Sequence, residues 1–156
     1  MSEVRVHLHD TMAGSYPLRL VDLLFCTDRV VVVEYDYLTG LDLVTGRADS
    51  RAEAFARVVS EDGIEAALDT AEHQRTLAYA DVERVVVHDG GRFGREKVTL
   101  CPDTARPIRV RVHGEVDVEA FVAAVRSTVD GHRTTVTVER GLGVSLEDLA
   151  ARLTPR

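Results

Sequence analysis

The chain has 156 residues, 45% of them hydrophobic, and a formal net charge of −7. This length fits a single domain that buries roughly 68–70% of its unfolded surface, and the hydrophobic content excludes a disordered tail. The acidic balance argues against general nucleic-acid binding, because that binding depends on neutralising phosphates. Valine is frequent, and β-branched residues favour strands, so we expect a β-rich protein.

The charged residues are used unequally. Lys97 is the single lysine, and Asp plus Glu outnumber Lys plus Arg by 26 to 19. An acidic, lysine-poor composition suits a halophilic protein in screening salt, although a high-G+C genome would also replace lysine with arginine. The sequence shows no signal peptide and no apolar run of about 20 residues. Cys26 and Cys101 are expected to be small buried residues, not a disulfide. We therefore expect a cytoplasmic protein without a transmembrane segment.

The first third of the chain predicts three strands. Residues 4–9 alternate strictly, with His7 and His9 on the polar face. Two apolar runs, 18–25 and 30–37, are separated by a short polar break, which predicts an antiparallel hairpin. The four consecutive valines at 30–33 indicate a strand that is covered on both faces.

The period then changes to that of a helix. Leu38–Gly46 is read as an apolar loop with two Thr-Gly pairs. Ser50 followed by Glu53 matches a capping box, and apolar residues follow at helical spacing until Gly63 interrupts them. We expect a helical hairpin over residues 50–73.

The second half predicts more strands and a helix. Strands are expected at 76–79, 81–88, 96–101 and 108–113. Asp117 is an expected N-cap for a helix that ends at Gly131. A short strand at 134–139 and a final packing or dimerising helix from Ser145 complete the chain. Because strands come in consecutive runs, an antiparallel α+β domain is favoured over a doubly wound one.

Two segments carry a family pattern. Residues 24–33 read LFCTDRVVVV, and residues 77–85 read LAYADVERV. The first is similar to a "T-D-x-R" turn before an apolar strand, and the second to an "I-x-Y-x-D-I-x-x-V" strand entry. Both resemble the pleckstrin-homology-like (PH-like) superfamily, in its GRAM and bacterial PH-like form.

This resemblance implies a fold. The expected single domain, 1–156, would hold a PH-like core over about 16–130: a β-barrel or sandwich of about seven strands capped by a helix. The helical insertion 50–73 and a strand-helix extension, 132–156, would be added to it. The basic first-hairpin loop that binds phosphoinositides in some relatives is not visible, because residues 10–17 contain no cation. A lipid head group is therefore a doubtful ligand.

The segment HDGGRFGREKV, residues 88–98, combines glycines with cations. It lacks the G-x-x-x-x-G-K-[ST] pattern of a phosphate loop and precedes no helix, so we read it as a hairpin loop. Around it, cations gather on what would be one sheet face or its loop. They form a candidate anion or acidic-partner site, unless they are only a solvated face; the set is Arg92, Arg95, Lys97, Arg109, Arg111 and His113.

Histidines give a further candidate chemistry. His7 and His9 have H-x-H spacing and can share a metal, but no motif marks more ligands. His88 next to Asp89 has the composition of a general base with its orienting group, but no activated nucleophile accompanies it. The sequence therefore marks no catalytic residue, and we expect no cofactor.

Three functions follow in order of preference. The first is a non-enzymatic PH-like module that binds a protein partner or a second copy of itself, as a possible homodimer. Its expected surfaces are the tail helix, the basic face and the apolar loop residues Leu41, Leu43 and Val44, which would be costly to leave exposed. The second is an anion or lipid-head-group binder using the basic face. The third is a metal-dependent hydrolase using His7 and His9.

Overall fold

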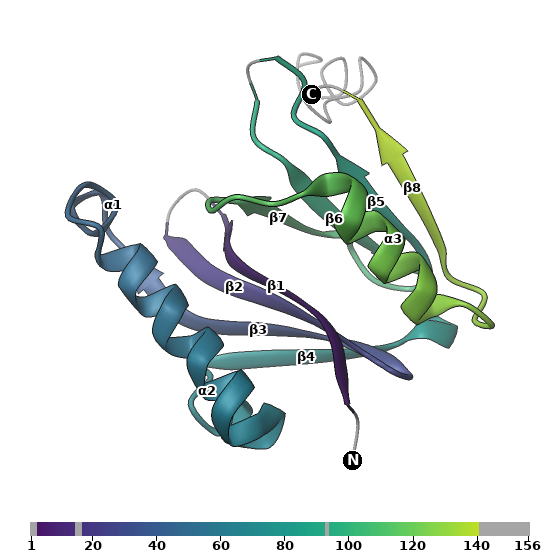
Figure 1. Ribbon diagram of the computed structural model, residues 1–156, viewed down its shortest axis with the longest axis horizontal. Coiled ribbons are helices and arrows are strands. Elements are labelled where there is room, and N and C mark those ends of the chain that lie inside the picture. Colours follow the sequence, from purple (N-terminus) through teal and green to yellow (C-terminus); the bar gives the residue numbers. More distant parts are fainter. Residues whose placement is uncertain (1–2, 15–16, 93, 141–156) are drawn as a thin grey trace, which may run out of the picture.

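The computed structural model describes residues 3–14, 17–92 and 94–140. Within these ranges the chain forms one eight-stranded mixed sheet and three α-helices, so the expected α+β class is confirmed (Figure 1). The strands are β1 (Val4–Ala13), β2 (Leu18–Cys26), β3 (Arg29–Leu38), β4 (His73–Ala78), β5 (Val82–His88), β6 (Lys97–Pro102), β7 (Ile108–Val112) and β8 (Thr135–Glu139).

The sheet has the order β4-β3-β2-β1-β7-β6-β5-β8. Its neighbours are antiparallel except β8, which pairs in parallel with β5. The expectation of a wholly antiparallel sheet is therefore wrong at this strand. Among the described residues β4 and β8 stand at the two ends of an open sheet, so a closed barrel is not shown.

The main core is enclosed by the two halves of the sheet and helix α3 (Val118–Val129). Asp117 is the N-cap, as expected, and its carboxylate accepts a hydrogen bond of 3.0 Å from the Ala120 amide. The buried face of α3 brings Phe121 to 6.0 Å from Phe25, ring centre to ring centre. Burying a phenylalanine contributes roughly 1.5–3 kcal/mol, so this contact anchors the helix on β2.

Helix α2 (Arg47–Asp69) covers the other face of β2 and β3. The valines at 30–33 are at most 4% exposed, which confirms that β3 is covered on both faces. Gly63 interrupts the helical dihedral angles with φ 88°, as its position predicted. Helix α2 thus consists of two helical segments that meet at a kink at Gly63, as expected, and the first segment begins earlier than expected. Ser50 is not the cap, because the N-cap is Gly46 and the Ser50 hydroxyl bonds back to the Gly46 carbonyl.

The apolar segment 38–46 is not simply a loop. Residues Gly40–Val44 form the short helix α1, closed by a capping box between Thr39 and Asp42. The Asp42 amide donates to the Thr39 hydroxyl at 3.3 Å, and the Thr39 amide donates to the Asp42 carboxylate at 2.7 Å. The carboxylate and hydroxyl thus replace missing backbone partners at the helix start.

The connection between β5 and β6 is a hairpin, as expected. Gly90 and Gly91 have positive φ, and a Cβ at Gly90 would lie 2.7 Å from the Gly94 carbonyl oxygen, so this position requires glycine. The expected strand 134–139 is present as β8, whereas the helix expected from Ser145 lies outside the described residues. Both cysteines are free; Cys26 is buried and Cys101 half-buried. None of the helices in the described ranges has the length and apolarity needed to cross a membrane.

Candidate functional site

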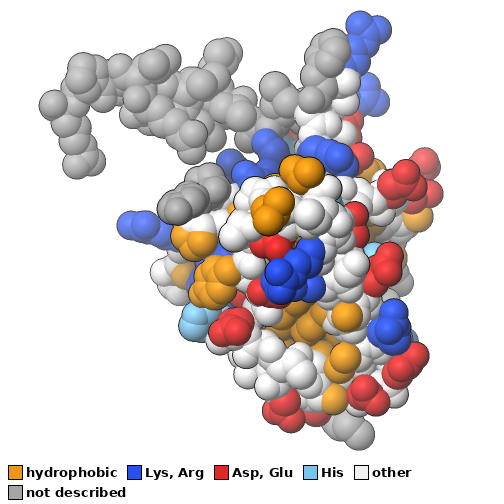
Figure 2. Space-filling view, turned by 90° about the vertical axis from the view of Figure 1, so that its left-hand side faces the viewer, with side chains coloured by type: hydrophobic (Ala, Val, Ile, Leu, Met, Phe, Trp, Pro, Cys, Tyr) orange, Lys and Arg blue, Asp and Glu red, His pale blue; other side chains and the backbone are white. Residues whose placement is uncertain are grey.

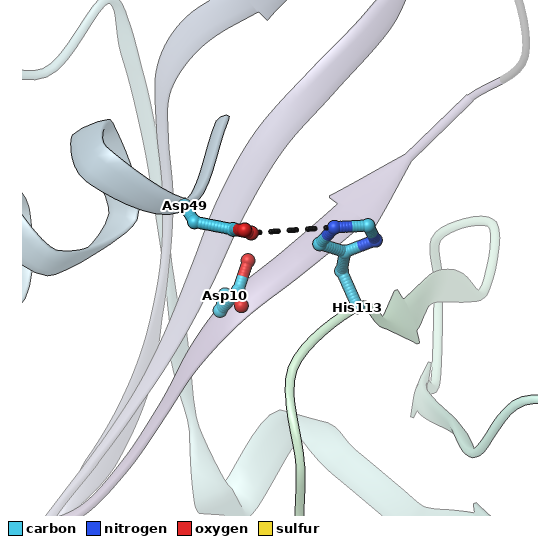
Figure 3. Close-up of side chains that lie close together, drawn as sticks. All are labelled: Asp10, Asp49 and His113. Carbon is cyan, nitrogen blue, oxygen red and sulfur yellow. Dashed lines mark ion pairs between the residues drawn. The ribbon is translucent and has the colours of Figure 1, made fainter. Parts of the chain in front are cut away.

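Two carboxylates and an imidazole from three distant segments meet at one point, which we call the acid–imidazole cluster: Asp10, Asp49 and His113. Figure 3 shows Asp10 on β1, Asp49 at the start of α2 and His113 just after β7, with their side chains turned toward one another. One ligand atom from each lies within 4.8 Å of the others. His113 Nε2 is 3.3 Å from Asp49 Oδ1. The cluster opens on a hollow of about 390 Å³, which we call the cluster pocket.

A β-bulge places Asp10. The register of β1 against β2 shifts between Leu8 and Thr11, which adds one residue to β1. Asp10 has φ 55°, the one positive φ among the described non-glycine residues, and Asp tolerates this region better than most residues. The bulge also reverses which face of the sheet the side chains of β1 point to. Leu8 and Met12, four residues apart, would share a face of a regular strand, but Leu8 lies in the main core and Met12 in a different cluster. Without the bulge, Asp10 would share the core face of Leu8.

The charge around the cluster is acidic. Burial raises the pKa of Asp10, and the neighbouring Asp49 adds to this rise, while His113 opposes it. Arg95 lies beside the pocket, but its guanidinium donates to the His113 carbonyl at 2.8 Å. His113 therefore does not extend the expected basic face, since its ring faces the carboxylates of Asp49 and Asp10.

The histidines expected to share a metal are used differently. His7 Nε2 lies 2.6 Å from Oδ2 of Asp22, a carboxylate with 0% exposure. Tyr35 donates to the other oxygen of Asp22 at 3.1 Å and stacks on Phe55 of α2 at 4.1 Å. This buried network fastens α2 to the sheet. Among the described residues, no three-ligand group contains His7 or His9; His9 instead lines the cluster pocket.

A second hollow, the mouth pocket, lies between the first four strands and the start of β7. Its volume is about 430 Å³. Ala13, Val21 and Val32, all members of the main core, line it together with polar residues. The full lining is Ala13, Gly14, Arg19, Val21, Val32, Glu34, His73, Gln74, Arg75, Pro107, Ile108 and Arg109.

The expected basic residues are partly brought together. Lys97 is paired with Arg111 and Thr99 with Arg109 in the β6–β7 register, so these side chains share one face, as anticipated. Arg109 also donates to the Thr99 hydroxyl at 3.3 Å and lines the mouth pocket. Arg95 lies at the cluster pocket, and Arg92 is exposed in the β5–β6 hairpin. The predicted group is therefore divided over several places.

His88 does not have the environment of a general base. The residue is 4% exposed, and its Nδ1 lies 3.5 Å from the carboxylate of Glu139, not that of Asp89. The Asp89 side chain accepts a hydrogen bond from the Gly91 amide at 3.0 Å. Burial lowers the pKa of His88, which Glu139 partly offsets.

Comparisons with known proteins address the fold. No family model and no curated protein matches the chain. Among solved structures, the hSac2 domain from the human phosphoinositide phosphatase Sac2 is similar, with a TM-score of 0.53 and 10% sequence identity. The match covers 93% of this chain and 80% of that one. At this identity the similarity concerns the fold alone.

Proposed function

We propose that the protein is a non-enzymatic binding module of PH-like architecture, and that it holds an anionic ligand with an apolar part in the mouth pocket. The observation that carries this proposal is the composition of the pocket. Three arginines, from β2, β4 and β7, surround a floor of core residues in a chain whose net charge is −7. A concave apolar site with a few polar groups is the usual form of a small-molecule site.

The strand register determines which side chains enter the mouth pocket. Arg75 is paired with Val32, and His73 with Glu34. Directly paired residues point to the same face, so Arg75 and His73 lie on the core-facing side with Val32. Arg19 is held by Glu34 at 2.7 Å. Three arginines against one glutamate leave a formal charge of +2 with His73 neutral, which favours an anion.

The size of the pocket is consistent with a small amphiphile. Its volume of about 430 Å³ falls in the roughly 300–1,000 Å³ range of small-molecule sites. The PH-like part of the proposal rests on the resemblance of residues 24–33 and 77–85, and on seven strands followed by a helix. The similar human domain comes from a phosphoinositide phosphatase, which is a reason to include a phosphate-bearing amphiphile among the probes.

Titration calorimetry with three probes tests this site. Octyl phosphate carries both the anion and the chain, octanol the chain alone, and inorganic phosphate the anion alone. We expect octyl phosphate to bind most tightly and Arg75→Gln to weaken it about 10-fold or more, since a charged hydrogen bond contributes roughly 1.5–3 kcal/mol. Arg84→Gln, on the exposed side of β5, is the matched control. Equal affinities for octyl phosphate and octanol, or equal losses in both variants, would contradict the proposal.

A separate observation favours a second candidate function, self-association. Helix α1 and the end of β3 that leads into it expose large apolar side chains, which we call the α1 patch. The exposed fractions are 45% for Tyr37, 71% for Leu41, 37% for Leu43 and 85% for Val44. Figure 2 looks at this side of the molecule and shows hydrophobic side chains at the surface among acidic and basic ones.

We propose that the α1 patch contacts the same patch of a second copy. A two-fold axis would cover both patches at once. A few side chains bury much less than the roughly 1,200 Å² of a stable interface, so the dimer would be weak and concentration-dependent. Sedimentation in dilute buffer and in molar KCl should show a dimer that Leu41→Ser with Val44→Ser abolishes. A monomer at every concentration would rule out this candidate.

A further inference from the structure

The acid–imidazole cluster has the donor types and spacing of a transition-metal site. Its ligand atoms lie within 4.8 Å of one another, and the Nε2–Oδ1 separation between His113 and Asp49 is 3.3 Å. Bonds of 2.0–2.1 Å in a tetrahedral zinc site place neighbouring ligand atoms about 3.3 Å apart. One pair therefore already has the required separation, and only Asp10 has to approach.

Backbone hydrogen bonds bring Asp10 and His113 together independently of their charges. The Asp10 carbonyl accepts hydrogen bonds from the amides of His113, at 2.8 Å, and Gly114, at 3.3 Å. This joins the bulge of β1 to the end of β7. Gly114 leaves room for the carboxylate, because a Cβ there would lie 2.7 Å from Asp10 Oδ2. These bonds hold the main chain of Asp10 beside His113.

Asp10 offers an unsatisfied acceptor oxygen at the centre of this arrangement. Asp10 Oδ1 is out of contact with solvent and has no hydrogen-bond partner among the described residues. A buried carboxylate oxygen without a partner is costly. The cluster pocket is also lined by Asp49, Glu53 and Glu115. Four carboxylates against Arg95 give a formal charge of −3 with the histidines neutral, which attracts a cation.

We propose that Asp10, Asp49 and His113 bind one divalent transition-metal ion of the Zn²⁺ class. The imidazole nitrogen distinguishes this site from those of Ca²⁺ and Mg²⁺, which prefer oxygen ligands throughout. Three protein ligands leave one position of a tetrahedral ion for water. This site is separate from the mouth pocket, and neither proposal depends on the other.

The ion would connect the inserted helix to the sheet. Asp49 lies in the first turn of α2, whereas Asp10 and His113 belong to β1 and the end of β7. Binding to the folded state alone raises apparent stability. We therefore expect Zn²⁺ to raise the melting temperature and to slow amide exchange at the start of α2, at residues 47–52.

Zinc titration of the chelator-treated full chain tests the proposal. We expect one Zn²⁺ per chain and no comparable effect of Mg²⁺. Asp49→Asn and His113→Gln should each weaken binding by at least about 10-fold. The matched controls are Glu53→Gln and Glu115→Gln, which remove a charge from the same pocket but lie outside the three-ligand set. Asp49 suits this test because its side chain is 56% exposed, so its replacement leaves the core intact.

Each outcome decides the question. Loss of binding in the Asp49 and His113 variants, with a clearly smaller loss in the Glu53 and Glu115 variants, supports the site. No saturable Zn²⁺ binding, an equal loss in all four variants, or loss only on His7→Gln would overturn it. If added Zn²⁺ raises the melting temperature of His113→Gln as much as that of the parent protein, the proposal is also overturned. This measurement does not depend on calorimetry.

Discussion

The buried network of His7, Asp22 and Tyr35 gives a quantitative prediction for Tyr35→Phe. This change removes the hydroxyl that donates to Asp22 at 3.1 Å but keeps the ring that stacks on Phe55. A hydrogen bond to a charged group contributes roughly 1.5–3 kcal/mol. For 150–250 residues, 1 kcal/mol shifts the melting temperature by about 2–4 °C. We expect a decrease of about 3–12 °C.

The pH dependence of this effect follows from Asp22. Burial raises the pKa of Asp22 above its ordinary value, and the bonds from His7 and Tyr35 partly offset this. The folded chain therefore takes up a proton at a higher pH than the unfolded chain does. The free-energy cost of burying the charged Asp22 carboxylate is absent below the pKa that Asp22 has in the unfolded chain. This cost is fully present once the pH has risen through the pKa that Asp22 has in the folded chain. The difference between Tyr35→Phe and the parent should thus narrow as the pH is lowered through the pKa of Asp22.

Thermal melts of both chains at neutral pH and at successively lower pH provide the measurement. Tyr37→Phe is the control, since Tyr37 lies on the same strand with 45% exposure. If Tyr35→Phe costs no more than Tyr37→Phe at neutral pH, the hydroxyl does not stabilise Asp22. If the difference in melting temperature between Tyr35→Phe and the parent widens as the pH falls, the Tyr35 hydroxyl does not stabilise the charged form of Asp22.

Further expectations concern pH, packing, the metal and salt. Burial lowers the pKa of His88, so the contribution of this histidine to stability is present above pH 6.5 and is lost as the pH falls. The slope is at most about 1.4 kcal/mol per pH unit. Urea titrations should show that the stability of His88→Gln depends less on pH than that of the parent, and His73→Gln serves as the exposed control. Phe121→Ala should cost about 3–5 kcal/mol in the same titrations, and a cost below 1 kcal/mol would contradict its role as the anchor of α3. Gly114→Ala should displace Asp10 and weaken Zn²⁺ binding about 10-fold, and unchanged binding would place the ion elsewhere. The acidic composition predicts a melting temperature that rises in molar KCl, and a flat profile would remove the halophilic interpretation.

The elements that the sequence predicted well are those specified by neighbouring residues. Alternation located the strands, Asp117 marked the start of α3, and Gly63 marked the break in α2. Helix α1 was missed although its signal was present, because Thr39 and Asp42 have the spacing of a capping box. The five-residue helix that follows was too short for a periodic pattern.

The features that were not predicted depend on contacts between distant residues. A bulge at Asp10 leaves no mark in the sequence, since it is a slip of β1 against β2. Nothing within β8 specifies β5 as its parallel partner. The acid–imidazole cluster was missed for the same reason: the sequence pattern places His113 on a basic face, and it does not reveal the approach of α2 with Asp49.

Strand β4 illustrates how one residue can serve two purposes. Among the described residues β4 ends the sheet, and residues 73–76 on it are polar and exposed. The unpaired backbone groups of an edge strand can pair with a strand of another chain, and a cationic side chain on the edge strand opposes this aggregation. Arg75 would thus protect against aggregation while it attracts a ligand, so a change to valine should reduce solubility more than a change to glutamine does.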